Sequence, residues 1–250
     1  MSDSSLVLPA PSSLRKTAPR LKRLFRKPKE QRYVESVLRK LAQGQTHSTL
    51  GNNLHDEAYT RGKAADWAKH LIDDFGLRPE HVCVEYGCGS LWAAEPVIAF
   101  LNPGQFIGLD VTHAFYEFGH QRIGDLLAEK RARFAVISRR CLRDVAALQP
   151  DLIFSRKVLS HVNKESLPRY LRNIARMMAP KTVAVLENTP TRDATGRLAG
   201  SRHTVEQMRP HLPAWLDIRQ ECSAAVVRHR AGSGAIPGLS PWIAPKGGGV

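Results

Sequence analysis

The stretch that decides the fold runs from Val82 to Ser90 and reads Val-Cys-Val-Glu-Tyr-Gly-Cys-Gly-Ser. Its first half is short and rich in apolar and β-branched residues, which predicts a buried strand. Gly87 and Gly89 follow at once, and a glycine lets the backbone turn tightly and approach a ligand with no Cβ in the way. The stretch therefore predicts a strand, a tight turn and a helix, with a ligand site at the turn.

The same alternation of strand and helix continues along the chain. Short apolar strands that alternate with helices predict a parallel sheet with helices on both faces. The last two apolar runs are too close together for a crossover helix, so they predict an antiparallel hairpin at the sheet edge. The further strands are expected at 106–109, 134–137, 152–154, 183–186, 216–220 and 224–228, and the helices at 91–101, 115–131, 142–148 and 164–178.

Two helices are expected before the first strand. One is amphipathic, because Tyr33, Val37 and Leu41 fall on one helical face and Gly44 stands where the helix would end. The second spans about 56–75. The predicted fold class is α/β, with a Rossmann-like, doubly wound, mostly parallel sheet, an antiparallel edge hairpin and preceding N-terminal helices.

Composition and charge divide the chain into three expected parts. Residues 1–45 form a basic, partly disordered tail with the amphipathic helix, 46–230 form the folded domain, and 231–250 form a Gly/Pro-rich disordered tail. The net charge is +14, of which the first 45 residues hold +8. Such a tail suits anionic lipid headgroups, nucleic acid or another polyanion, and a solvated arm is the alternative.

The sequence also indicates a compartment. No stretch approaches the roughly 20 apolar residues of a membrane span, and none resembles the apolar core of a secretory signal. We therefore expect a cytoplasmic protein, at most peripheral at the inner face of a membrane. The cysteines lack the spacing of a zinc or redox site, so no metal site is predicted and all are expected to be free thiols; they are Cys83, Cys88, Cys141 and Cys222.

The next predicted strand ends in an acidic residue, Asp110. In dinucleotide-binding folds this position accepts hydrogen bonds from ribose hydroxyls, so it predicts an adenosine-containing cofactor. The dinucleotide fingerprint also needs a third small residue behind the pyrophosphate, and here that position is Trp92. S-adenosylmethionine (SAM) has no phosphate, and the Glu85 carboxylate suits its cationic methionine end.

At these residues the sequence resembles the class I SAM-dependent methyltransferases over about residues 80–190. The segment Glu85–Gly89 is similar to the family's glycine-rich first motif, and Gly108–Asp110 to the acidic end of its second strand. Residues 151–162 resemble its fourth motif, and 171–186 its helix–Pro–strand segment. Four motifs in this order favour the family, although no single one is specific.

The resemblance implies SAM as the cofactor and assigns roles around it. The residues that it places in the cofactor site are Glu85, Gly87, Cys88 and Gly89 on the methionine side, Asp110 at the ribose and Ser155 near the sulfonium. The reaction would be a one-step displacement that needs mostly alignment, and a hydroxyl acceptor would also need a base. His161, at an expected helix start facing the site, is the leading candidate base; a capping or packing histidine is the alternative.

Three positions depart from the family pattern. Leu91 stands where many members have a third glycine, and Pro180-Lys181-Thr182 replaces the usual Pro-Gly-Gly turn. The third strand is followed by Ser138–Leu142, which lacks the acid that often contacts adenine. The adenine contacts are therefore not assigned.

Further polar residues are candidates for the site, and each could instead have a purely structural or surface role. They are His113 and Tyr116 (pocket lining or packing), Arg156-Lys157 (binding an acidic substrate or a solvated pair), Glu187-Asn188 (acceptor contact or surface), and the basic segment 188–212 with Arg192, Arg197, Arg202, His203, Arg209 and His211 as a lid.

The predicted function is methyl transfer to a small-molecule, sugar or lipid-linked acceptor, most simply at a hydroxyl. The expected partners are a small-molecule or glycan acceptor and an anionic membrane surface that the tail contacts; nucleic acid is less favoured. Neither an Asn-Pro-Pro-Tyr motif nor a Pro-Cys nucleophile of base methylation occurs. The alternatives are an RNA or protein methyltransferase and a non-catalytic scaffold of the same fold.

Overall fold

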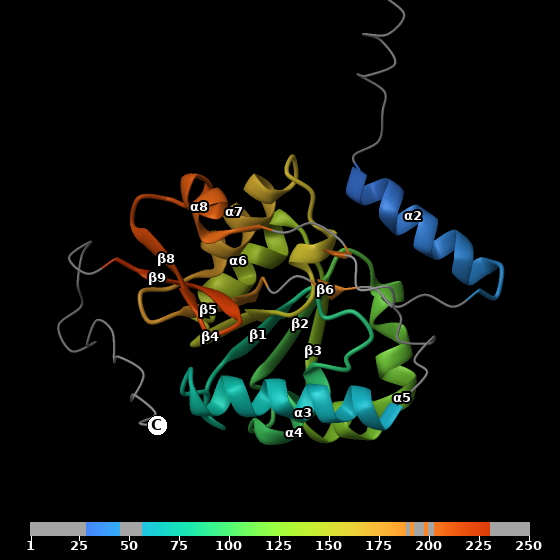
Figure 1. The fold of residues 1–250 in the computed structure, drawn as a ribbon. Helices are drawn as coiled ribbons and strands as arrows, with labels where there is room; N and C mark the ends of the chain where they lie inside the picture. The colour runs from blue at the N-terminus through green and yellow to red at the C-terminus, as the bar shows by residue number, and fades with distance from the viewer. Residues whose placement is uncertain (1–28, 46–56, 189–190, 193–197, 200–202, 231–250) are drawn as a thin grey trace, which may run out of the picture.

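The computed structural model describes residues 29–45, 57–188, 191–192, 198–199 and 203–230. A seven-stranded sheet in the order β3-β2-β1-β4-β5-β9-β8 forms its centre (Figure 1). The first five strands run parallel. Their bounds are β1 Cys83–Tyr86, β2 Phe106–Asp110, β3 Arg133–Val136, β4 Leu152–Ser155 and β5 Val183–Glu187. The predicted α/β class and the predicted strands are confirmed.

The central strands are apolar because both of their faces are covered. Every residue of β1, β2 and β4 is buried, whereas β3, at the sheet edge, is exposed or half-buried throughout. Glu85 of β1 lies level with Gly108 of β2 and Phe154 of β4. The carboxyl ends of these three strands therefore meet at one edge, where a ligand binds in doubly wound sheets.

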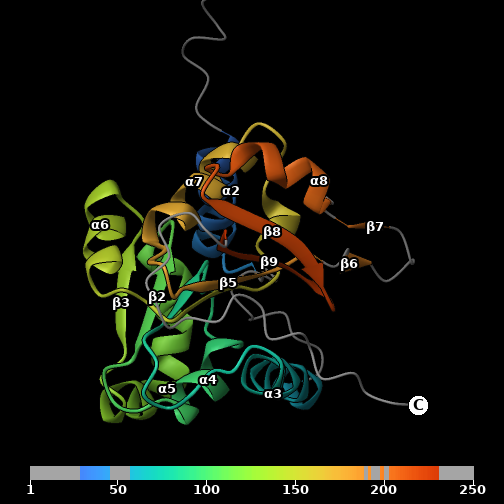
Figure 2. The ribbon, with the colours of Figure 1, turned by 90° about the vertical axis from the view of Figure 1, so that its left-hand side faces the viewer.

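Helices cover both faces of the sheet in two layers (Figure 2). Alternate strand residues point to opposite faces, so Cys83 and Phe154 belong to one apolar core and Val84 and Ile153 to the other. The first core packs against α3 Glu57–Asp73, α4 Ala94–Phe100 and α5 Glu117–Glu129; the second packs against α6 Arg139–Ala147, α7 Leu167–Met177 and α8 Val205–Met208.

The predicted helix at 164–178 starts three residues late. Asn163 Oδ1 accepts hydrogen bonds from the Glu165 and Ser166 backbone N–H groups, which holds a turn before α7 begins at Leu167. Its apolar stripe is buried as expected, with Leu171 and Ile174 fully inaccessible. The helical spacing of the apolar residues therefore predicted the helix correctly, and the hydrogen bonds of the Asn163 side chain determine where it begins.

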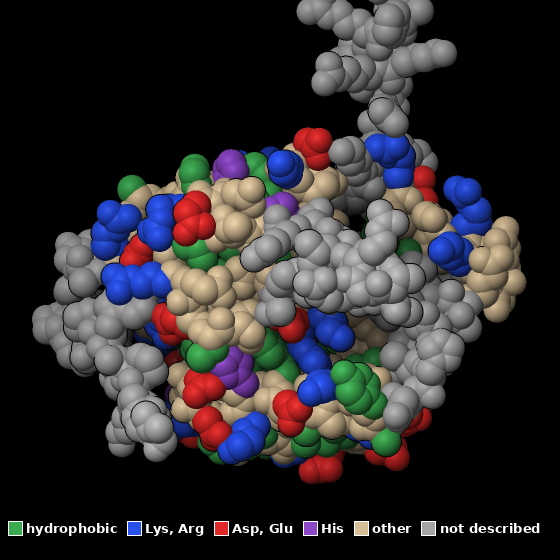
Figure 3. Space-filling view, in the orientation of Figure 1, with side chains coloured by type: hydrophobic (Ala, Val, Ile, Leu, Met, Phe, Trp, Pro, Cys, Tyr) green, Lys and Arg blue, Asp and Glu red, His purple; other side chains and the backbone are tan. Residues whose placement is uncertain are grey.

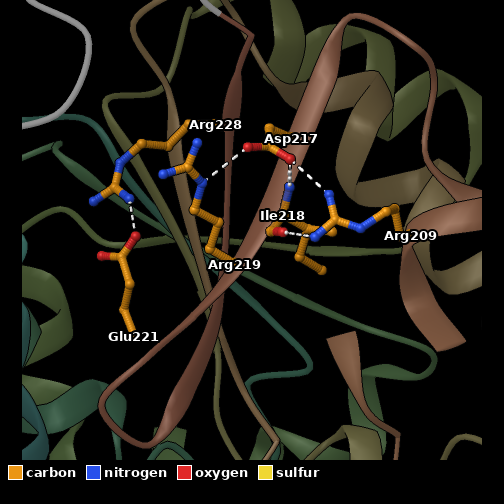
Figure 4. A network of polar contacts seen from close by, with 6 residues as sticks. All are labelled: Arg209, Asp217, Ile218, Arg219, Glu221 and Arg228. Carbon is orange, nitrogen blue, oxygen red and sulfur yellow. Dashed lines mark hydrogen bonds and ion pairs between the residues drawn. The ribbon is translucent and has the colours of Figure 1, made fainter. Parts of the chain in front are cut away.

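The predicted antiparallel hairpin is confirmed by β8 Leu216–Glu221 and β9 Ala224–His229. The β9 strand pairs antiparallel with β5, and β8 lies at the sheet edge. Charged contacts fasten the hairpin to the short helices beside it (Figure 4). Arg209 donates to Asp217 Oδ1 at 2.8 Å and to the Ile218 carbonyl at 2.7 Å.

The predicted amphipathic N-terminal helix is α2, Lys29–Ala42. Val37 is 1% exposed and forms a small apolar cluster with Phe115, against which Tyr33, Val34 and Phe118 pack. The chain turns at Gly44, whose φ of 68° a glycine adopts without strain, as expected for a helix end. The helix thus docks on the domain through one short apolar stripe.

In the part of the chain that the structure describes, no helix is both long and apolar enough to cross a membrane.

Candidate functional site

In the turn after β1, packing within the protein requires a glycine, in addition to any close approach of a ligand. Gly87 has φ of 86° and Gly89 has φ of 48°, both in the left-handed region. A Cβ on Gly87 would overlap the Val158 side chain, which lies in the loop after β4. The sequence explained this glycine by ligand approach alone; the structure adds the contact with Val158, so the loop after β4 covers the turn.

Leu91, at the position of the family's third glycine, keeps the conformation that a glycine would adopt. Its φ is 62°, an uncommon value for a residue with a side chain. The side chain is fully buried and occupies the space beside Gly119, where a Cβ would overlap it. Burial of a leucine offsets the backbone strain, so this departure from the family pattern leaves the path of the turn intact.

Asp110 ends β2 and closes onto the turn. It is 4% exposed; its Oδ2 accepts a hydrogen bond from the Gly89 N–H at 2.8 Å and its Oδ1 from the Val111 N–H at 2.7 Å. Burial raises its pKa to about 6, and the two backbone hydrogen bonds oppose the rise. A carboxylate accepts about four hydrogen bonds, so Asp110 can also accept from two hydroxyl groups of a ribose.

Glu85 carries a buried carboxylate oxygen that lacks a partner. The residue is 2% exposed, and its Oε2 accepts no hydrogen bond from the described residues. Burial raises its pKa well above the usual range, the nearby Arg156 charge lowers it, and Asp110 raises it further. A buried oxygen without a donor is costly, and a cationic amine at the turn would satisfy it. The Glu85 side chain therefore fits the methionine end of SAM.

The structure places Ser155 and Cys88 inside the protein. Ser155 is 1% exposed and its hydroxyl donates to the Tyr86 carbonyl at 2.7 Å. The Tyr86 hydroxyl in turn accepts from Asn173 Nδ2 at 2.9 Å. Cys88 is 4% exposed, and burial raises the pKa of its thiol. Both side chains are buried in the protein, and the approach of Ser155 to the sulfonium, which the resemblance implied, stays a prediction.

The loop after β4 is anchored by Arg156, Lys157 and Glu187. Arg156 donates from Nη2 to the Lys63 carbonyl at 3.0 Å, and its Nε lies 3.9 Å from Glu187 Oε2. The same Glu187 oxygen accepts from the Lys157 backbone N–H at 2.8 Å. The Arg156 side chain is only 11% exposed, so the prediction of a solvated Arg156-Lys157 pair was wrong for Arg156. Glu187 fixes the loop.

His161 does not start a helix, so that part of its prediction was wrong. It is the last residue of the short 3-10 helix Leu159–His161 and is exposed. Its ring stacks on Tyr33 of α2, with centroids 5.4 Å apart and planes at 29°. This contact supports the packing alternative, and a role as base stays a prediction.

The α2 helix lies beside the carboxyl ends of β2 and β4 (Figure 1). It contacts Phe115, in the loop after β2, and His161, in the loop after β4. Of the two pocket candidates in this region, His113 is exposed, while Tyr116 is half-buried and its ring lies close to those of His120 and Phe134. The α2 helix therefore forms one side of the site, a role that the sequence alone did not assign.

Trp92 joins the turn to the helices around it. The Arg122 guanidinium lies 3.7 Å from the centre of the indole ring and that of Arg61 lies 5.3 Å from it. Both arginines also pair with Glu95. This cluster connects α3, α4 and α5 at the exit of the glycine turn. Arg61 and Arg122 lie 34 positions before and 27 positions after Glu95, so no local sequence signal indicated the cluster.

The basic segment 188–212 is only partly available as a lid. His203 is 2% exposed and its Nε2 is bonded to the Val162 carbonyl at 2.6 Å, so its place in a lid was wrong. Arg209 is likewise occupied by the hairpin. Arg197 and Arg202 lie outside the described residues. The Asn188 amide donates to Gln220 Oε1 at 2.8 Å, so this side chain makes a contact within the fold.

After β3, Ser138 caps α6, and its hydroxyl accepts from the Cys141 N–H at 3.1 Å. All four cysteines are free thiols. No cluster of three metal-binding side chains occurs among the described residues.

Comparison with known proteins identifies the family of this chain. The model of a family described as "Methyltransferase domain" matches residues 57–225. The chain therefore belongs to the methyltransferase-domain family and is a class I SAM-dependent methyltransferase, with SAM as its cofactor.

Solved structures that are similar to this chain have low sequence identity to it. A magnesium protoporphyrin IX methyltransferase from Synechocystis PCC 6803 with bound SAM is 17% identical, with a TM-score of 0.49, over 67% of this chain and 79% of that one. An S-adenosylmethionine-dependent methyltransferase from Clostridium acetobutylicum is 10% identical, with a TM-score of 0.45, over 79% of this chain and 98% of that one.

Proposed function

We propose that the enzyme holds SAM between the Gly87–Gly89 turn, Glu85 and Asp110, and transfers its methyl group to a hydroxyl of a small-molecule, sugar or lipid-linked acceptor. The observation that carries the cofactor site is the arrangement of two buried carboxylates on either side of the turn. Asp110 is bonded to Gly89, and the Glu85 Oε2 lacks a donor.

The chain's own residues would act mainly by binding and alignment. Bound SAM supplies an electrophilic methyl group. The Glu85 carboxylate accepts hydrogen bonds from the amine of the methionine part, and Asp110 accepts from the ribose hydroxyls. The loop after β4, which packs on Gly87 through Val158, excludes water from the turn. An acceptor hydroxyl must lose a proton, and His161 is the candidate to receive it.

The covered side of the site supports a small acceptor. The α2 helix packs against the loops after β2 and β4, which narrows the approach from that side. We assign the catalytic domain to residues 46–230 and the basic tail to 1–45, as the sequence predicts. Attachment of the tail to an anionic membrane would bring the enzyme to lipid-linked acceptors.

A polymer acceptor is the second candidate. The first 45 residues hold a net charge of +8, which would also attract RNA.

The deciding experiment uses radiolabelled SAM and a panel of hydroxylated small molecules, lipid-linked sugars and RNA. The proposal expects label in a small-molecule or lipid fraction, and expects the Glu85→Gln variant to lose SAM affinity while staying folded. Label only in RNA or protein would refute the acceptor class. No label in any fraction despite tight SAM binding would favour the non-catalytic scaffold.

A further inference from the structure

One residue of the loop after β4 has a backbone conformation that the fold does not require. The described non-glycine residues with positive φ are Leu91, Arg131, Gln149, Lys157 and Cys222. Such values are uncommon for residues with a side chain and, where the fold gives no reason for them, cluster at functional sites.

Four of these five residues have an ordinary explanation. Arg131 and Gln149 come directly after Lys130 and Leu148, the C-cap residues of α5 and α6, where helices often end in a left-handed residue. Cys222 lies in the two-residue turn between β8 and β9, which requires positive φ. Leu91 takes the place of a glycine in the turn described above. Only Lys157 is left without a helix end, a hairpin or a glycine-like position.

Lys157 is held in this conformation from both sides. Its φ is 57°, its N–H donates to Glu187 Oε2 at 2.8 Å, and its carbonyl accepts from the Ser160 hydroxyl at 2.8 Å. The next residue, Val158, packs on Gly87. Lys157 therefore lies at the cofactor turn.

Arg156 and Lys157 are neighbours in the sequence, but their charged groups have different surroundings. The Arg156 guanidinium is occupied by the Lys63 carbonyl and Glu187, and it lies 5.8 Å from the centre of the Trp67 ring. Lys157 is exposed, and among the described residues its ammonium forms no ion pair. The surrounding protein still partly shields the Lys157 ammonium from water; this desolvation and the Arg156 charge lower the pKa of Lys157, and Glu187 opposes them. Lys157 is thus a cation next to Val158 and the turn that no acid of the described part neutralises by contact.

We infer that Lys157 binds an anionic group, a carboxylate or a phosphate, on the methyl acceptor and so helps to select it. This inference rests on the proposed function, because it takes the turn at Gly87 as the cofactor site. Figure 3 shows basic and acidic side chains meeting near the centre of one face of the molecule, above α3. An ammonium on a flexible stem suits an anionic group whose exact position varies between acceptors.

The test uses inorganic phosphate as the probe. Calorimetry measures phosphate binding to the full chain saturated with S-adenosylhomocysteine, the demethylated product of SAM. The Lys157→Asn variant removes the charge but keeps a residue that tolerates the left-handed conformation. The Lys157→Arg variant keeps the charge, and Lys164→Asn removes an exposed lysine seven positions further on.

The expected result is selective. Lys157→Asn weakens phosphate binding by about tenfold or more, the effect of losing a hydrogen bond between charged groups. Lys157→Arg and Lys164→Asn retain phosphate affinity within about twofold, a change of less than 0.5 kcal/mol. Phosphate bound by the basic N-terminal residues contributes equally to every variant and cancels in the comparison.

Two outcomes would overturn the inference. Equal phosphate affinity in Lys157→Asn and the wild-type chain would show that this lysine does not bind anions. Equal losses in Lys157→Asn and Lys157→Arg would show that the positive charge is not the determinant. S-adenosylhomocysteine binding is measured in the same titrations, so a failure of the cofactor site would be seen separately as loss of that binding in the wild-type chain.

Discussion

Asp110 makes cofactor binding and stability respond to acid in opposite directions. Its pKa is about 6 in the free protein, and ribose hydroxyls bind best to the ionised carboxylate. A carboxyl with this pKa is about 90% protonated at pH 5 and about 1% protonated at pH 8. SAM affinity should therefore fall about tenfold between pH 8 and pH 5 from Asp110 alone, and Glu85, whose pKa is also raised, would steepen the fall.

The stability of the free protein should change the other way. The folded-state pKa of Asp110 is raised from 3.8 to about 6, so the folded state binds its proton more tightly than the unfolded state does. The corresponding stability is fully present below pH 3.8 and is lost as the pH rises through about 6; the difference is about 3 kcal/mol.

The assay pairs calorimetric titration of SAM with urea unfolding of the free protein, each at several pH values between 5 and 8. Asp110→Asn cannot titrate, so its SAM affinity, although weaker at pH 8, should depend less on pH, and the wild-type-minus-variant difference in unfolding free energy should decrease as the pH rises. A flat SAM affinity in the wild-type protein, or an identical pH slope in Asp110→Asn, would refute the reasoning.

Three further predictions concern the turn and the tail. Gly87→Ala should lower the unfolding free energy by about 1–3 kcal/mol, because the residue has positive φ and its Cβ meets Val158; urea unfolding checks this, and adding Val158→Ala should recover the steric part. Leu91→Gly relieves strain but empties a fully buried position, so a net loss of about 2 kcal/mol or more is expected in the same assay; a gain would mean that strain dominates. Deletion of residues 1–30 should remove most of the salt-sensitive sedimentation with anionic liposomes and leave SAM affinity unchanged, whereas equal sedimentation of both proteins would leave the tail as a solvated arm.

The fold could be predicted because its signals are local. Buried parallel strands are continuous apolar runs, and the stripe of α7 repeats at helical spacing, so each element is visible in a short window of sequence. The edge hairpin followed from the distance between its two runs. The place of Asp110 at the end of β2 could be predicted for the same reason, since the end of a strand is a position that the sequence itself marks; its role at the ribose stays a prediction.

The site could be predicted only in part, because the partner of a polar side chain is set by distant residues. Arg156 was read as solvated, yet its guanidinium bonds a carbonyl 93 positions away. His203 was read as part of a lid and is bonded to Val162, 41 positions away. No periodicity or motif encodes such pairings, and they decide whether a basic residue faces a ligand or the protein interior.

The small contact that docks α2 has a consequence for how molecules enter and leave. Val37 and Phe115 are the buried residues of that contact, and two such side chains contribute only about 3–6 kcal/mol before the entropy of docking is subtracted. Local opening of this helix therefore needs much less free energy than unfolding of the sheet. We expect amide hydrogens of α2 to exchange with deuterium well before those of β1 and β4. The enzyme would then exchange product for substrate through a side that opens by itself, while the two carboxylates of the proposed cofactor site stay in place.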